Sequence, residues 1–76
     1  MKLEKGQSLM FGNVNGTRRI WVFDGPKLVG EFDFKDVPQD INLQDGTAKA
    51  FVEKEAAKYG LFAKPQTDTP YVFDLV

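Results

Sequence analysis

Short segments rich in apolar residues, of the kind that form β-strands, occupy the first third of the chain. Two such segments, residues 7–12 and 17–23, flank Asn15-Gly16. This dipeptide favours a two-residue hairpin turn, because both of its residues accept a positive φ. A second turn at Asp24-Gly25-Pro26 leads into residues 27–34, whose later half alternates apolar and acidic positions. The pattern predicts a three-stranded antiparallel meander.

The hydrophobic period changes from two to about 3.6 residues between positions 43 and 59. The resulting apolar stripe comprises Ala48, Phe51, Val52, Ala56 and Tyr59. Asn42 or Asp45 can cap the start of this helix, and Gly60 suits the left-handed residue that ends it. We predict one amphipathic helix, followed by a loop and a fourth strand over residues 71–76.

These elements predict a single α+β domain over residues 1–76, in the order βββαβ. Its small antiparallel sheet, a three-stranded meander plus a C-terminal strand, packs on the one helix. The chain has no cysteine, so no disulfide can help the apolar core to hold the fold. No segment approaches the roughly 18 apolar residues of a membrane span, and the charged N-terminus does not resemble a signal peptide. We therefore expect a cytoplasmic protein that does not contact membranes.

Side chains alternate across a strand, so the length of each turn decides which residues share a face of the sheet. Two even-numbered loops would place Trp21 and Phe23 on one face with Phe32. We assign that face to the helix and expect Phe51 and Phe73 to complete the core there. The same reasoning predicts an apolar outer face, consisting of Leu9, Phe11, Ile20, Val22 and Val29.

The outer face has two interpretations. One helix cannot cover both faces of a sheet, and a large exposed apolar patch usually marks a contact with a partner. Alternatively, a bulge or a three-residue loop reverses the phase of one strand, or the N-terminal tail or Leu61-Phe62 folds over the outer face.

Catalytic and metal-binding groups are scarce in this sequence. Histidine and cysteine are absent, and Ser8, the only serine, has no histidine to activate it. Acidic side chains remain, but no phosphate-binding glycine loop or calcium-loop spacing accompanies them. We expect a protein that is not an enzyme and that holds no metal or cofactor.

The segment from residue 31 to residue 45 carries five acidic side chains against Lys35 alone. Four of them, which we call the acidic strip, are Glu31, Asp33, Asp36 and Asp40. Such a strip can steer a basic partner, although solvated loop acids are also ordinary surface. The sequence thus predicts an interaction module, an inhibitor or modulator of another protein. It would bind that protein, or a second copy of itself as a homodimer, through the outer face and the acidic strip.

Nucleic-acid binding is the alternative function. Arg18, Arg19 and Lys27 lie near Trp21 in the sequence, and sheet-based binders combine basic and aromatic side chains in this way. The formal net charge of −1 weighs against it, because phosphate contacts require local positive charge.

Overall fold

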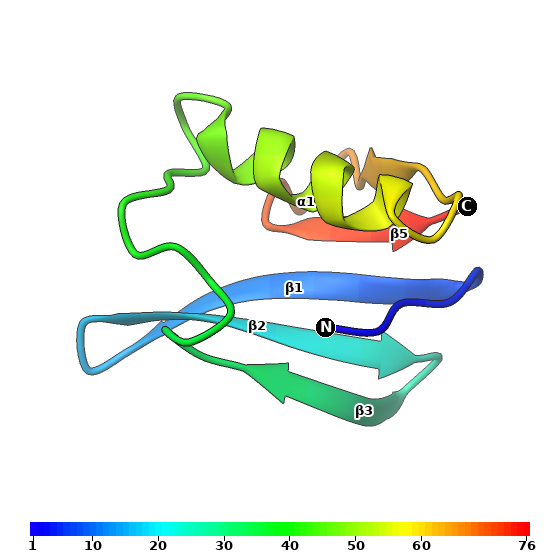
Figure 1. Ribbon diagram of the computed structural model, residues 1–76, viewed down its shortest axis with the longest axis horizontal. Coiled ribbons are helices and arrows are strands. Elements are labelled where there is room, and N and C mark those ends of the chain that lie inside the picture. The colour runs from blue at the N-terminus through cyan, green and yellow to red at the C-terminus, as the bar shows by residue number, and fades with distance from the viewer.

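The computed structural model describes all 76 residues as a five-stranded antiparallel sheet with one helix (Figure 1). The elements are β1 Gln7–Val14, β2 Thr17–Asp24, β3 Lys27–Phe32, α1 Thr47–Ala57, β4 Ala63–Pro65 and β5 Val72–Leu75. The strands lie in the order β3-β2-β1-β5-β4. The α+β class is confirmed, but the sheet has five strands rather than four, because β4 falls in the predicted loop.

The first hairpin forms as its turn residues predict. Asn15 and Gly16 have φ values of 52° and 81°, and Val14 pairs with Thr17 on either side of them. This register places Leu9 opposite Val22. The alternation expected within the β1–β2 hairpin is therefore confirmed.

The second hairpin contains a β-bulge, one of the alternatives that we considered for the apolar outer face. Phe23 pairs with Leu28, whereas Val22 pairs with Gly30, so Val29 is an extra residue in β3. An extra residue reverses the alternation of everything beyond it. Phe32 therefore lies opposite Ile20 and not on the face of Trp21, contrary to our expectation.

The C-terminal strand β5 lies in the interior of the sheet, between β1 and β4. Leu9 pairs with Phe73 on one side, and Ala63 pairs with Leu75 on the other. Strand β4 is three residues long and ends at Pro65, and the Gln66 N–H after it still donates to the Val72 carbonyl of β5 at 3.0 Å. A strand this short and proline-bound has no alternating pattern that could predict it.

Helix α1 is shorter than predicted at its N-terminus. Gly46 precedes it with φ 86°, and the Asp45 carboxylate accepts hydrogen bonds from the Thr47 hydroxyl (2.6 Å) and the Thr47 backbone N–H (3.0 Å). Mainly through the hydroxyl bond, these contacts lower the pKa of Asp45 below the usual range of an aspartate. At the other end, Gly60 has φ 72°, as the left-handed stop requires.

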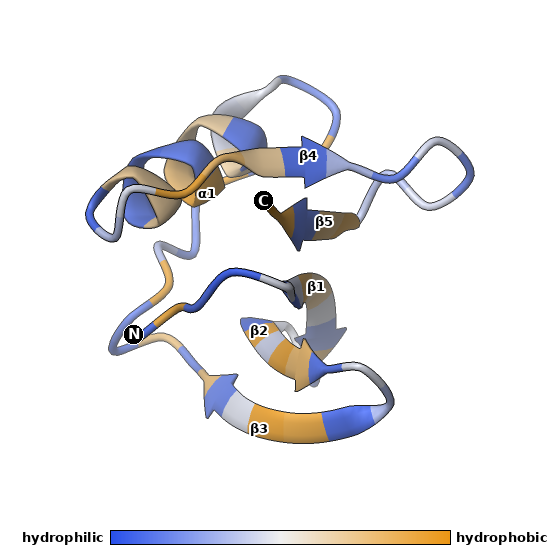
Figure 2. Cartoon of the chain, turned by 90° about the vertical axis from the view of Figure 1, so that its right-hand side faces the viewer, coloured by the Kyte–Doolittle hydropathy of each residue, from blue (hydrophilic) through white to orange (hydrophobic).

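The sheet curves, and the helix, the N-terminal segment and the connection between β3 and α1 all lie on one side of it (Figure 2). The core on this side comprises Leu3, Leu9, Phe11, Ile20, Val22, Val37, Ile41, Ala48, Val52, Ala56, Phe73 and Leu75. Four residues that we placed on the outer face, Leu9, Phe11, Ile20 and Val22, are thus buried on the same side of the sheet as the helix. Trp21 points to the opposite side of β2 and is only half-buried.

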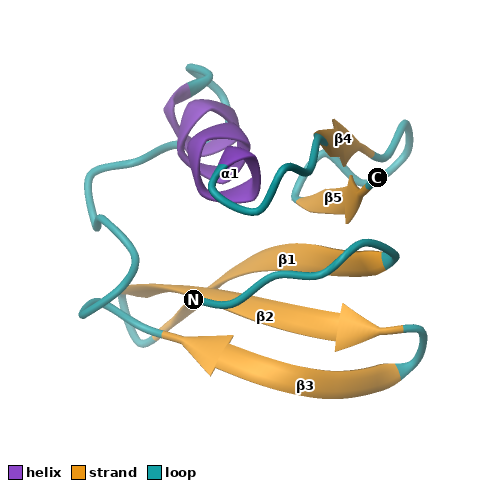
Figure 3. Ribbon diagram, turned by 45° about the vertical axis from the view of Figure 1, so that its right-hand side comes forward, coloured by secondary structure: helices purple, strands orange, loops and turns teal.

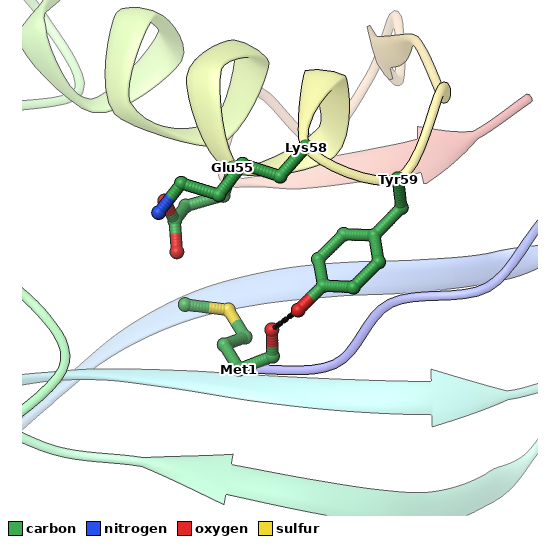
Figure 4. Close-up of polar contacts among 4 residues, drawn as sticks. All are labelled: Met1, Glu55, Lys58 and Tyr59. Atoms are coloured by element: carbon green, nitrogen blue, oxygen red, sulfur yellow. Dashed lines mark hydrogen bonds and ion pairs between the residues drawn. The ribbon is translucent and has the colours of Figure 1, made fainter.

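The N-terminal segment closes part of the core that an eleven-residue helix cannot reach. Leu3 is 2% exposed, and the Gly6 N–H donates to the Leu75 carbonyl at 2.9 Å. The Tyr59 hydroxyl donates to the Met1 carbonyl, which ties the end of the helix to the start of the chain (Figure 4). Tyr59 is 42% exposed and so is not the core residue that we predicted. The tail covers the helix side of the sheet, not the other side.

Candidate interaction surface

One face of the sheet is covered by no other element and carries an apolar cluster. This cluster, which we call the open face, comprises Met10, Trp21, Phe23, Leu28 and Val72. Met10 pairs with both Trp21 and Val72, and Phe23 pairs with Leu28. Directly paired residues share a face, so the five side chains line one surface. Leu28 is 44% exposed and the other four are half-buried.

The absence of a side chain at Gly12 lets the Trp21 ring lie flat against the sheet. A Cβ at Gly12 would lie 1.9 Å from the Trp21 ring, so the indole occupies the space above a position without a side chain. The indole Nε1 donates to the Glu31 carboxylate on β3 at 3.1 Å. The ring is therefore positioned from both neighbouring strands while remaining accessible.

Charges of both signs accompany this apolar cluster. Arg19 pairs with Gly12, and Lys64 pairs with Asp74, which in turn pairs with Ser8. Gln66 donates to the Asp74 carboxylate at 3.0 Å. Together with Glu31, the face thus presents two cationic and two anionic side chains around its apolar centre. Such a mixture is typical of the rim of a protein–protein interface.

The predicted site residues do not form the predicted surface. Of the five apolar ones only Val29 is exposed, at 45%, because it is the bulged residue of β3. Both faces of the hairpin carry apolar residues, and the helix covers the face that we predicted to be the outer one. One signal could have distinguished them: the face of Trp21 also carries Ser8, Gly12 and Arg19, whereas the strand centres on the other face are entirely aliphatic or aromatic.

The acidic strip is divided between β3 and the connection that follows it. Glu31 is exposed on β3, and Asp33 begins a turn in which its carboxylate accepts the Lys35 N–H at 3.2 Å. Asp36 and Asp40 are exposed on either side of Val37, which is 1% exposed and anchors this connection in the core. The geometry therefore gives Asp33 a contact with Lys35 and Glu31 a contact with Trp21, and leaves Asp36 and Asp40 facing solvent.

The predicted basic residues are not brought together. Arg18 and Arg19 lie on opposite faces of β2, and Lys27 begins β3. Arg18 is engaged by the connection, since its backbone N–H donates to Gln39 Oε1 at 2.7 Å and its carbonyl accepts from Gln39 Nε2 at 3.1 Å. Only Arg19 shares the open face with Trp21.

Comparisons with protein-family models, with curated proteins and with solved structures find no match to this chain. The structure itself contains no group of three or more acidic side chains placed to hold a metal ion, and its single helix is too short and too polar to cross a membrane.

Proposed function

We propose that this protein is a non-enzymatic interaction module that binds another protein through the open face of its sheet. The observation that carries the proposal is the apolar cluster of Met10, Trp21, Phe23, Leu28 and Val72 on the side of the sheet that nothing else covers. An apolar cluster that no other element covers is a common mark of a contact surface.

Trp21 is the natural anchor of this interface. Tryptophan is enriched among the residues that contribute most to protein–protein affinity, because it removes a large area from water at a small cost in side-chain entropy. The Glu31 hydrogen bond and the glycine beneath the ring already fix its orientation. Little further ordering is then needed when a partner binds.

The charges favour a protein partner over a nucleic acid. Glu31 and Asp74 would repel phosphates from the face on which Arg19 and Lys64 could attract them. An inhibitor or modulator of a protein is consistent with a small domain that offers one such face. Nucleic-acid binding is the alternative, because Arg19 lies on the same face as Trp21. It would appear as an affinity for DNA or RNA that falls steeply as the salt concentration rises.

The test uses two matched phenylalanine variants. Phe23→Ser removes a ring from the open face, whereas Phe62→Ser removes one that is 76% exposed, in the segment between α1 and β4. After affinity capture from the native host and identification of the partner, both variants are titrated with that purified protein. We expect Phe23→Ser to weaken binding by about tenfold or more and Phe62→Ser to leave it unchanged.

Circular dichroism should show the same fold for both variants. Equal affinity of wild type and Phe23→Ser would refute the open face as the binding surface, whichever protein is captured.

A further inference from the structure

A cavity of about 340 Å³ lies on the helix side of the sheet, at the end that carries the β1–β2 turn. Figure 3 shows the connection between β3 and α1 passing this end of the sheet on its way to the helix. The cavity is lined by residues of β1, β2, this connection and the segment before β5, namely Phe11, Gly12, Asn13, Arg18, Leu43 and Tyr71. It therefore lies on the opposite side of the sheet from the open face.

The walls of this cavity are held in place by contacts within the protein. The Gln39 side-chain amide bonds both backbone groups of Arg18, at 2.7 and 3.1 Å, which fixes the connection against β2. The Phe11 N–H donates to the Tyr71 carbonyl at 2.9 Å, and Leu43 packs at the border of the core. The cavity is thus preformed, and its volume falls at the lower end of the range of small-molecule sites.

Arg18 supplies the only charge in this lining, and nothing in the protein compensates that charge. Its Nε is shielded from solvent and donates to no acceptor. The one ion pair of the molecule joins Lys58 to Glu55, so the Arg18 guanidinium has no carboxylate beside it. A half-buried guanidinium in this state favours an anion, because an anion replaces the interactions with water that burial removes.

The remainder of the lining combines neutral donors with apolar surface. Asn13 uses its side-chain oxygen to accept the Gly16 N–H at 3.0 Å, which leaves its amide nitrogen able to donate elsewhere. Tyr71 is 42% exposed and offers both a ring and a hydroxyl, and Leu43 adds aliphatic surface. A mostly apolar cavity with a few polar groups suits a ligand that has an apolar body and one anionic group.

The other two cavities of the molecule lack this combination. One, of about 270 Å³, brings together Lys2 and Glu4, whose opposite charges offset each other. The second has no hydrophobic residue in its lining. The Nε of Arg19 is unpartnered as well, but Arg19 lines none of the three cavities.

We propose that the cavity beside Arg18 binds a small monocarboxylate with an apolar body. The carboxylate pairs with the Arg18 guanidinium, and the apolar part contacts Leu43 and Tyr71. The single positive charge of the site favours a monoanion over a phosphate, whose second charge would be left without a partner. The inference goes beyond the proposed function, since it concerns a small molecule and the other side of the sheet.

Phenylacetate serves as the probe, and nitrogen–proton correlation NMR spectra of the wild type follow its titration. We expect saturable shifts of the amide signals of Asn13, Arg18 and Leu43 at millimolar phenylacetate, while the signals of the open face stay in place. Phenylacetamide has the same shape without the charge, and acetate has the charge without the ring. Each should bind about tenfold or more weakly than phenylacetate.

Two matched arginine variants locate the charge that is responsible. Arg18→Gln removes the guanidinium but keeps the backbone groups that Gln39 bonds, and it should weaken phenylacetate binding by about tenfold or more. Arg19→Gln, at the next residue and on the opposite face of β2, should bind phenylacetate like wild type. Spectra of the free variants check that both retain the fold.

The contrast between phenylacetate and phenylacetamide requires no variant, so it tests the role of charge even if Arg18→Gln fails to fold. The absence of saturable shifts in the wild type, or shifts centred on another part of the molecule, would overturn the proposal. So would equal affinity for phenylacetamide, an Arg18→Gln variant that binds like wild type, or an equal loss in Arg19→Gln.

Discussion

On the open face, the Trp21 ring packs directly over Gly12. The Trp21 ring occupies the space that a side chain at Gly12 would need, since a Cβ placed there would lie 1.9 Å from the ring. Gly12 has no positive φ, so its role is the space it leaves rather than its backbone freedom. The indole can therefore pack against β1 only because Gly12 has no Cβ.

Gly12→Ala should push the indole off the sheet and break its 3.1 Å bond to Glu31. Trp21 is the only tryptophan, so intrinsic tryptophan fluorescence reports on it alone. We expect its emission to shift to longer wavelength in the folded variant as the ring becomes more exposed. Gly16→Ala, where a Cβ would meet no atom within 4 Å, serves as the comparison and should leave the emission maximum in place even if the strained turn costs stability. An unchanged spectrum in Gly12→Ala would mean that the ring does not rest on this glycine.

Among the elements, helix α1 begins next to a carboxylate, that of Asp45, which lies two residues before Thr47 and accepts its hydrogen bonds. The bonds from Thr47 lower the pKa of Asp45, so the folded state favours the ionised carboxylate. This contribution is complete above the pKa that Asp45 has in the unfolded chain, and it is lost as pH falls through the lower pKa of the folded state. Asp45→Ala should therefore lower Tm at neutral pH, and the gap to wild type should narrow in acid.

Thermal melts monitored by circular dichroism between neutral pH and strong acid would measure this gap. Asp36→Ala removes an exposed carboxylate that makes no side-chain hydrogen bond and should leave Tm nearly unchanged throughout. A gap in Asp45→Ala that does not depend on pH would contradict the lowered pKa of this carboxylate.

The elements also show which parts of the fold the sequence could predict. Asn15-Gly16 and Gly60 act locally, through the φ values they accept, so the first hairpin and the end of the helix were predicted correctly. The bulge at Val29 depends on how β3 fits against β2 and the core, and no residue type marks it. The open face was missed for a related reason: alternation separates two faces but does not say which of them the helix covers.

At the scale of the whole molecule, an aromatic contact joins the neighbouring strands β1 and β5 in the core. Phe73 is 2% exposed, and its ring meets that of Phe11 edge-on, with centroids 6.0 Å apart and planes at 75°. Phe51, which we expected at the centre of the core, is half-buried at its border. Their substitution should therefore have unequal effects.

Phe73→Ala should destabilise the protein by about 3–5 kcal/mol, a large share of the roughly 5–15 kcal/mol typical of a whole domain. Phe51→Ala should cost clearly less, because less of its ring leaves an apolar environment on unfolding. Urea unfolding of both variants measures the difference. Equal losses, or a larger loss for Phe51→Ala, would contradict this description of the core.

The position of β5 also governs the order in which the chain can fold. Its residues Val72–Leu75 fill the gap between β1 and β4, two strands that are far apart in the sequence. The β1–β2–β3 meander consists of neighbours in sequence and can pair early, but β4 has no strand to join until β5 arrives. During synthesis, the apolar face of the meander, with Leu9 at its centre, therefore lacks the part of its cover that Phe73 and Leu75 provide until the last strand is made.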